Sequence, residues 1–194
     1  MSDFGFIEPK PLDGTEAIGD LGTVRDFWRW SASDLLSNAT RGILAEFIVA
    51  RALGNTESVR REWDAYDVLT PEGIKVEVKS AAYIQSWHQD KPSQVVLRIA
   101  PTMAWDAKTN KLSTEKKRQA DVYVFALLDC QDQRKVDPLD LDQWRFFVLS
   151  SRVLDRKLPE AKTIGLAGLM RLGPLEVGVD GLARAVRDAH APFA

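Results

Sequence analysis

Four charged residues in the first half of the chain have the types and order that metal-assisted hydrolysis of a phosphodiester requires. They are Glu46, Asp67, Glu77 and Lys79. Carboxylates can hold a divalent cation such as Mg²⁺, which neutralises charge on the phosphoryl and leaving oxygens and lowers the pKa of a bound water. A lysine beside the cation can orient the attacking water and stabilise transition-state charge. This chemistry works only if the fold brings the four side chains together.

A β-hairpin is expected to bring the second and third of these residues together. Residues 61–70 and 74–79 have the composition of strands, and residues 71–73, Pro-Glu-Gly, suit a turn. Pairing across this turn sets Asp67 directly opposite Glu77, with Cβ atoms about 4.5–5.5 Å apart. Like charges at that distance repel unless a positive charge lies between them, and a divalent cation is the simplest candidate.

Alternation along the strands gives this hairpin a charged face and an apolar face. Lys79 shares the face of Glu77, whereas Val76 and Val78 point the other way into the core. Asp64, the other nearby acid, has the opposite parity from the first carboxylate and is expected on the other side of its strand. The hairpin alone leaves an alternative open, in which a solvent-facing strand pair carries ordinary surface ion pairs.

A long helix is predicted to carry Glu46. It is expected over residues 35–53, with Ser33 as its cap and Gly54 as its stop. Glu46 lies beside the apolar stripe of this helix, so its carboxylate is expected to be at least partly desolvated. Because an unpaired buried charge costs several kcal/mol or more, we expect the carboxyl group to be protonated, paired with a base or bound to a metal.

The glycine one turn before this acid supports a site. Gly42 is costly in a helix interior, and it would leave open space beside the carboxylate of Glu46. The alternative is that the glycine allows close packing of the helix and that a base neutralises the carboxylate. The candidate bases are Arg41, Arg51 and Lys79.

The chain carries Glu46 on a helix, Asp67 on a strand and Glu77-Val78-Lys79 on the next strand. This order resembles the PD-(D/E)XK nuclease superfamily, which has the restriction-endonuclease-like fold. The resemblance covers about residues 33 to 130. It implies an αβββαβ core, Mg²⁺ with Mn²⁺ as a substitute, and Lys79 as a catalytic residue. Asp67 and Glu77 would be the main metal ligands, the backbone carbonyl of Val78 a third, and Glu46 a ligand directly or through water.

Residues around the motif agree with the superfamily in part. Tyr66 stands where a proline often precedes the aspartate, which is a common departure. Ser80 and Gln85 match branches that carry a small polar residue and a glutamine there. Gln85 could contact the metal-bound water or a base, and the alternative is an exposed loop amide.

A local basic segment suggests contact with nucleic acid, which the resemblance to a nuclease makes DNA more than RNA. A predicted long loop between two strands carries Lys108, Lys111, Lys116, Lys117 and Arg118 against the single acid Glu115. Such a segment can neutralise backbone phosphates, with Arg41 and Arg51 on the long helix as additions. The alternative is a solvated loop, which is the usual environment of a charge run.

Composition limits the class of protein. The 194 residues are 45% apolar and 28% charged, which suits a globular chain with a real core. A net charge of -2 excludes a protein that coats DNA through its overall positive charge. The single cysteine, Cys130, excludes an internal disulfide and a zinc site of the Cys-x-x-Cys kind.

The longest apolar run, 122–128, is far shorter than the about 20 residues of a membrane span, and the opening residues lack the basic flank of a signal peptide. We therefore expect a cytoplasmic protein without a membrane partner.

The organisation predicted along the chain is an N-terminal arm, residues 1–30, and a single domain, residues 31–194. The domain has a core over about 33–150 and a C-terminal helical extension over 151–194. The arm is expected to be irregular, and its aromatic end, residues 27–30, to pack against the long helix. Further strands are expected at 94–99, 122–128 and 145–149, and helices at 151–156, 166–172 and 182–189. The fold class is therefore α/β (α+β), with a mixed central sheet flanked by helices and the 122–128 strand at its centre.

These expectations define a metal-dependent DNA endonuclease of the restriction, repair or junction-resolving type. The alternative is a non-catalytic module that retains the fold and binds nucleic acid or protein. A homodimer is a further possibility, because restriction enzymes of this fold often act as dimers, although no interface signature is visible in the sequence.

Overall fold

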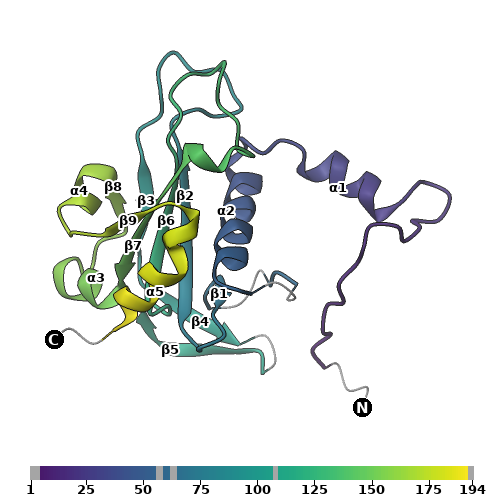
Figure 1. The fold of residues 1–194 in the computed structure, drawn as a ribbon. Coiled ribbons are helices and arrows are strands. Elements are labelled where there is room, and N and C mark those ends of the chain that lie inside the picture. Colours follow the sequence, from purple (N-terminus) through teal and green to yellow (C-terminus); the bar gives the residue numbers. More distant parts are fainter. Residues whose placement is uncertain (1–4, 56–58, 62–64, 107–108, 192–194) are drawn as a thin grey trace.

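A five-stranded mixed sheet forms the centre of the molecule. The computed structural model describes residues 5–55, 59–61, 65–106 and 109–191. The strand order is β1-β2-β6-β7-β9, with bounds Val68–Leu69, Lys75–Ala82, Val122–Leu128, Trp144–Ser150 and Leu175–Val177. Strands β2 and β6 are parallel and the other neighbours are antiparallel, and helices lie on both sides of the sheet (Figure 1). The predicted fold class, α/β (α+β) with a mixed sheet between helices, is confirmed.

Strand β6 occupies the middle of this sheet because its sequence can be buried on both faces. Every residue of the strand is buried. Its neighbours β2 and β7 pair with it along its whole length. A strand that is apolar at every position is shielded from water only when both of its faces are covered, so the predicted central position is confirmed.

Helix α2, Asn38–Ala52, begins later than the sequence pattern predicted. Its cap is Ser37, whose hydroxyl accepts a hydrogen bond from the N–H of Thr40. The predicted cap, Ser33, instead ends the preceding helix. The residues in between form a local turn, in which the Asp34 carboxylate accepts hydrogen bonds from two following backbone N–H groups. This turn competes with helix formation and shortens the predicted helix at its start.

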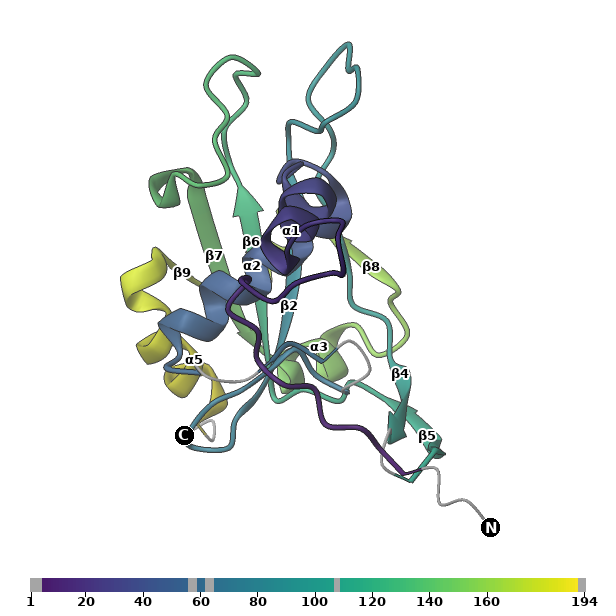
Figure 2. The same ribbon diagram turned by 90° about the vertical axis from the view of Figure 1, so that its right-hand side faces the viewer.

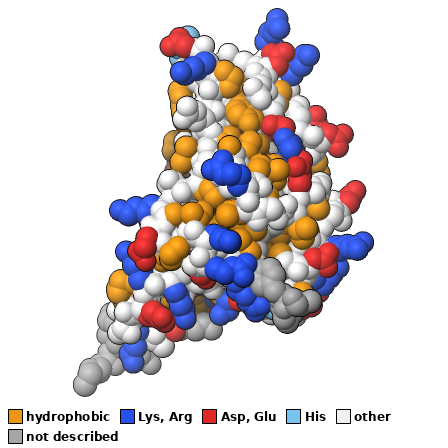
Figure 3. All heavy atoms as spheres, turned by 90° about the vertical axis from the view of Figure 1, so that its left-hand side faces the viewer, with side chains coloured by type: hydrophobic (Ala, Val, Ile, Leu, Met, Phe, Trp, Pro, Cys, Tyr) orange, Lys and Arg blue, Asp and Glu red, His pale blue; other side chains and the backbone are white. Residues whose placement is uncertain are grey.

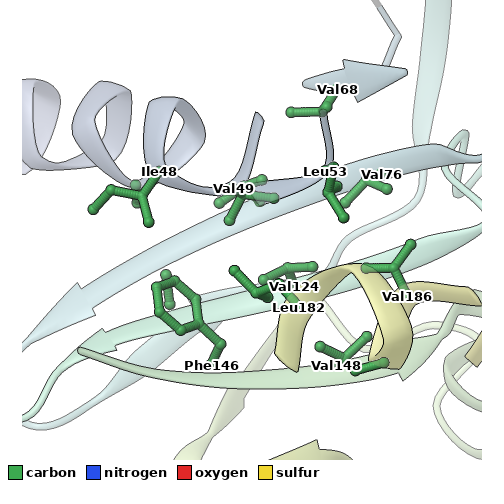
Figure 4. Close-up of a cluster of buried hydrophobic side chains, with 14 of the residues drawn as sticks. Ile48, Val49, Leu53, Val68, Val76, Val124, Phe146, Val148, Leu182 and Val186 are labelled. Atoms are coloured by element: carbon green, nitrogen blue, oxygen red, sulfur yellow. The ribbon is translucent and has the colours of Figure 1, made fainter. Parts of the chain in front are cut away.

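One face of the sheet is covered by α2 and by α5, Leu182–His190. Figure 4 shows apolar side chains of both helices pointing toward the sheet. The buried cluster contains Ile48, Val49 and Leu53 from α2, Leu182 and Val186 from α5, and Val76, Val124, Phe146 and Val148 from the sheet. Because Val76 and Val124 lie on this face, their strand neighbours point to the opposite face.

The opposite face is covered by shorter elements. They are α3, Ser151–Lys157, α4, Leu166–Met170, and a small antiparallel sheet of β3, Val96–Arg98, and β8, Thr163–Gly165. A second buried cluster lies beneath them and includes Tyr123, Phe125 and Leu127 of β6. On the side of the molecule with α3, α4 and β8, Figure 3 shows hydrophobic side chains gathered in the middle of the surface, with lysines and arginines around them.

Most of the predicted later elements are confirmed in type. The expected strands at 122–128 and 145–149 and the three expected helices after residue 150 are present. The strand expected at 94–99 is shorter and belongs to the small sheet rather than to the central one. Two short 3-10 helices, η1 at Leu141–Gln143 and η2 at Val179–Gly181, complete the chain. Among the described residues, no helix has the length and apolar character that a membrane crossing requires.

The basic segment predicted as a loop is a β-hairpin instead. Strand β4, Thr102–Asp106, pairs with β5, Lys111–Lys117, in antiparallel order. The side chains of β5 are exposed at all positions except Ser113. Without a buried face, the strand has no alternation of apolar and polar residues, which is the pattern that identifies a strand in sequence.

The N-terminal arm contains a helix, which corrects the expectation of an irregular segment. Helix α1, Val24–Ala32, begins with a capping box between Thr23 and Asp26. None of its residues is buried, and Trp30 is 85% exposed, so the predicted packing of this aromatic segment against the long helix is wrong for Trp30. Trp28 lies beside Gly14, where an added Cβ would come within 2.9 Å of the ring. Figure 1 shows α1 and the arm to one side of the sheet, and Figure 2 shows the arm reaching from α1 toward the end of the molecule that carries the β4–β5 hairpin.

Candidate active site

The turn between β1 and β2 sets the predicted register. Val68 lies opposite Val76 and Leu69 opposite Lys75, as predicted, and this pairing ends one residue before Asp67. Strand β1 is much shorter than the strand expected over residues 61–70. The N–H of Thr70 donates to the carbonyl of Ile74 at 3.0 Å, which continues this register toward the turn. At the other end, the N–H of Asp67 donates to the carbonyl of Val76, also at 3.0 Å, one residue away from Glu77, the partner that the sequence predicted.

Gly73 makes this turn possible. Its φ of +87° lies in the left-handed region, which side chains with a Cβ rarely adopt. The N–H of Ile74 also donates to the hydroxyl of Thr70 at 3.1 Å, which closes the turn with a side-chain bond. The local sequence therefore determines the register in which β1 pairs with β2.

The two faces of β2 differ as alternation predicted. Val76 and Val78 are 0% and 5% exposed in the core beneath α2. The side chains of Glu77 and Lys79 are 20% and 27% exposed, and the Lys79 ammonium forms an ion pair with the Glu77 carboxylate. The parallel register with β6 sets Glu77 beside Tyr123 on the face away from α2. Strand β2 therefore has one partly exposed charged face and one buried apolar face.

Asp67, Glu77 and Lys79 line one cavity of about 390 Å³. The cavity lies between the β1–β2 hairpin, strand β6 and the β3–β4 region. Figure 1 shows β1 and β4 at the same end of the sheet. Three of the four residues that sequence analysis selected therefore meet in one place.

The carboxyl group of Asp67 is electrostatically strained. Burial, and after it the negative charge of Glu77, raises its pKa from 3.8 to about 6. Two interactions oppose this rise: the positive charge of Lys79 and a 2.7 Å hydrogen bond that the N–H of Val78 donates to Oδ2. The negative charge of Glu46 is a smaller cause in the raising direction. At the Asp67 carboxylate, the repulsion from Glu77 is therefore larger than the attraction of Lys79, which favours a cation beside the two acids.

Glu46 lies in an adjoining cavity of about 180 Å³, which Asp67 also lines. Its carboxylate is 16% exposed and is held by Arg60 through contacts of 2.5 and 3.1 Å. The partner is therefore none of the three bases considered from the sequence. The free space expected beside Gly42 is present, because an added Cβ would have no neighbour within 4 Å.

In the described structure, the three acids do not form a metal site made of protein side chains alone. Within the described parts of the chain, no three His, Cys, Asp or Glu side chains are grouped so that they could hold a metal ion. Asp67 and Glu77 share one cavity, while Glu46 reaches Asp67 from the next. The two carboxylates in one cavity could hold a cation that completes its shell with water and phosphate oxygens, as Mg²⁺ commonly does.

Two residues predicted to contact nucleic acid are instead buried against each other. Arg41 is 3% exposed and Gln85 is 6% exposed, and Nη1 of the arginine donates to Oε1 of the glutamine at 3.0 Å. The arginine also donates to Ser80, Asn38 and the carbonyl of Leu36. Its charge is thus satisfied inside the protein, and neither residue is a surface contact or an exposed loop amide.

The predicted basic segment contains one buried residue and several exposed ones. Arg118 has a side chain that is 1% exposed and pairs with Asp155 at 2.6 Å. It also donates to the carbonyls of Ile99 and Leu158, at 2.9 and 2.8 Å, so the predicted role in phosphate contact does not apply to it. The three lysines that remain available at the surface, all on β5, are Lys111, Lys116 and Lys117. Lys108 lies outside the described residues.

Several residues of the cavity carried no signal in the sequence. They include Arg98 on β3, Trp105 on β4, Gln119 just before β6 and Tyr123 on β6. They come from separate segments, and their convergence depends on how the small sheet and the β4–β5 hairpin pack beside the central sheet. Arg60 was missed for a similar reason, because nothing in its own segment indicates that it faces α2.

A comparison with protein families adds an independent observation. The family model described as "Bacteriophage T4 endonuclease IV" matches residues 28–166, well over half of the chain. No curated protein sequence matches the chain. The matched range contains Glu46, Asp67, Glu77 and Lys79 together with the lining of both cavities.

Proposed function

The chain belongs to the bacteriophage T4 endonuclease IV family, a family of nucleases, and from this premise we propose that it is a metal-dependent DNA endonuclease with a site of the PD-(D/E)XK type. The observation that carries this proposal is the single cavity lined by Asp67, Glu77 and Lys79. The order of these residues on a β-hairpin, with Glu46 on the preceding helix, supports the resemblance to that superfamily. The alternative, a binding module that retains the fold, would need none of the electrostatic strain at Asp67.

The donor set defines how a cation would be held. The carboxylates of Asp67 and Glu77 would bind Mg²⁺ or Mn²⁺ in the cavity, the carbonyl of Val78 would be a further ligand, and Glu46 would act through water. When bound, the cation supplies neutralisation of phosphoryl charge and a lower pKa for the attacking water. Arg60 can stay paired with Glu46 in this arrangement, because a ligand that acts through water need not leave its ion pair.

Lys79 orients the attacking water and stabilises the charge that develops on the phosphoryl oxygens. Its ion pair with Glu77 keeps the ammonium in the cavity. A cation bound by the two carboxylates would weaken the hold of Glu77 on the ammonium and free its N–H groups for water and phosphate. Asp67 must be ionised to hold the cation, so the affinity for the cation should fall as pH falls through about 6, where protons compete for its carboxylate in the metal-free protein.

The exposed lysines of β5 would bind the DNA backbone near this cavity. Lys111, Lys116 and Lys117 project from a hairpin whose partner strand, β4, lines the cavity. Exposed lysines bind phosphates without reading sequence, so their contribution should weaken with added salt. Restriction, repair and junction resolution are all consistent with this chemistry, and the dimer stays a prediction.

DNA cleavage with matched variants tests the proposal. Wild-type protein should cut plasmid DNA with Mg²⁺ or Mn²⁺ and not with EDTA, and both Asp67→Asn and Lys79→Ala should remove the activity. Asp188→Asn and Lys135→Ala are matched controls, since these side chains are 57% and 78% exposed and lie away from both cavities. Unchanged cutting by both site variants, or cutting that survives EDTA, would reject the assignment.

A further inference from the structure

Two side chains that line the cavity, those of Arg98 and Tyr123, are not used in the mechanism proposed above. Arg98 is exposed on β3, and Tyr123 is 4% exposed on β6, yet both line the same cavity as Asp67, Glu77 and Lys79. They come from two different sheets, the small one and the central one. The cavity is therefore bounded by the acids on the β1–β2 hairpin and by two hydrogen-bond donors from other elements.

Both donors are without a protein partner. Within the described chain, the guanidinium of Arg98 makes no hydrogen bond or ion pair, and the hydroxyl of Tyr123 makes no hydrogen bond. Burial and the charge of Glu77 raise the pKa of Tyr123, so its phenol stays protonated and able to donate. By contrast, the buried Arg41 and Arg118 use their nitrogens on protein oxygens.

The charge balance of the cavity identifies the ligand that would satisfy these donors. Arg98 is not paired with either carboxylate of the cavity, and Glu77 is paired with Lys79 instead. A divalent cation on the two carboxylates would leave the cavity with net positive charge from the lysine and the arginine. A phosphodiester anion matches that charge, and the planar fork of an arginine fits two phosphate oxygens at once.

The buried guanidinium of Arg118 helps to hold the strand that carries Arg98. Arg118 donates to the carbonyl of Ile99, the residue that follows Arg98, and pairs with Asp155 on α3. Strand β3 is held from its other side by β8, with Arg98 opposite Thr163. Strand β3 is therefore held by contacts to α3 and to β8, and these contacts fix the backbone that positions the guanidinium of Arg98.

We infer that Arg98 and Tyr123 form a phosphate-binding wall of the cleavage cavity, in which the guanidinium of Arg98 contacts two oxygens of a backbone phosphate and the hydroxyl of Tyr123 donates to a third acceptor on the same nucleotide. The inference rests on the proposed function for the identity of the ligand, a DNA phosphodiester. It adds two substrate-contacting residues that belong to neither the metal ligands nor the basic hairpin.

DNA binding with Ca²⁺ in place of Mg²⁺ or Mn²⁺ tests this wall separately from catalysis, because Ca²⁺ also takes carboxylate ligands and neutralises the two acids. The probe is a fluorescein-labelled DNA duplex, with its single strand as a second probe, and fluorescence anisotropy in Ca²⁺ is followed over a range of salt concentrations. Arg98→Ala should weaken binding about 10–100-fold and lower the slope of log Kd against log salt by about 0.9, because the variant neutralises one phosphate fewer. Tyr123→Phe should weaken binding about 2–10-fold and leave the slope unchanged, since the phenol is neutral.

Three further variants separate contact from structure. Arg98→Lys should keep the salt slope and recover part of the affinity, because it retains the charge but not the fork. Arg134→Ala, at an arginine that is 92% exposed, and Tyr83→Phe, at a tyrosine outside the cavity, should bind as wild type does. Thermal melting of Arg98→Ala should match wild type, since an exposed side chain without protein partners adds little stability.

The outcomes distinguish this inference from the proposed function. If Arg98→Ala keeps both the affinity and the salt slope of Arg134→Ala, or if the wild-type protein binds neither probe, the phosphate wall is rejected. If the wild-type protein binds DNA with the predicted slope change but does not cut it with Mg²⁺ or Mn²⁺, the wall stands and the endonuclease assignment falls. If the wild-type protein cuts DNA while Arg98→Ala leaves the binding unchanged, the endonuclease assignment stands and the phosphate wall is rejected.

Discussion

The two β-hairpins of the chain both carry charged side chains, but they hold them in different surroundings. The β1–β2 hairpin encloses Asp67 and Glu77 so closely that the pKa of Asp67 rises to about 6. The β4–β5 hairpin leaves its lysines in water, where each charge is solvated at little cost. Charge becomes reactive where packing limits its solvation, while charge that stays solvated can only attract a partner. The first hairpin therefore has the properties of a reaction site and the second those of a binding surface.

The largest difference between the hairpins should appear in the rate of cleavage. Lys79→Ala should reduce DNA cleavage about 100–1,000-fold or more, because the missing ammonium acts on charge that exists only in the transition state. Single-turnover assays with saturating protein measure this step. Lys116→Ala, on the other hairpin, serves as the control and should cut at nearly the wild-type rate under saturation. Equal rates for the two variants would contradict the distinction between the hairpins.

Stability should reveal the electrostatic strain at Asp67. The folded-state pKa of about 6 exceeds the ordinary value of 3.8, so the folded protein binds more protons than the unfolded chain between these values. The free energy of unfolding should therefore fall as pH rises from about 4 through about 6. Asp67→Asn lacks this titration and should be more stable than wild type at neutral pH, by about 1–3 kcal/mol, because one pKa unit corresponds to about 1.4 kcal/mol.

Urea unfolding over that range of pH measures the effect. Asp188→Asn, which replaces an exposed carboxylate, should follow the wild-type dependence. If Asp67→Asn were less stable than wild type at neutral pH, the strain attributed to the first hairpin would be absent.

Cation affinity should respond to the neighbouring ion pair. Arg60→Ala removes the partner of Glu46 and leaves more negative charge beside Asp67, so the affinity for Mn²⁺ should rise about 2–10-fold, as expected for a change of about 0.5–1.5 kcal/mol in a partly exposed pair. The gain in melting temperature on Mn²⁺ titration reports the affinity. Arg61→Ala is the control, because Arg61 pairs with Glu8 of the arm and does not contact Glu46. A loss of affinity in Arg60→Ala would show that the arginine supports the site rather than competing for Glu46.

The smallest effect is expected from the second hairpin. Replacing Lys116 and Lys117 together with alanine should weaken DNA binding only several-fold at moderate salt, and the salt slope should fall by up to about 0.9 for each phosphate that the variant no longer neutralises. Stability should change by less than about 0.5 kcal/mol, because both side chains are exposed. Anisotropy titrations at several salt concentrations measure the affinity and the slope, and urea unfolding measures the stability. An unchanged slope would remove this hairpin from the DNA-binding surface.

Sequence reasoning was most successful where neighbours along the chain decide the structure. The turn with Gly73 determines the register that sets Val68 opposite Val76, and alternation along β2 separates Val78 from Lys79. It was less successful at the start of α2, where the side chain of Asp34 forms a competing local turn. It was wrong for the β4–β5 hairpin, because a strand without a buried face has no periodicity to detect.

Taken alone, the sequence determined the order of acids and lysine, the hairpin register and the central place of the most apolar strand, since each depends on chain geometry or on apolar runs over a few residues. Only the tertiary structure decided which charges serve the fold and which face a cavity. Arg118 is buried against Asp155, whereas Arg98 is without a partner in the described chain, and neither outcome is visible in the local pattern. The physical reason is that the solvation and the partners of a side chain depend on segments far away along the chain, which meet only when the layers pack.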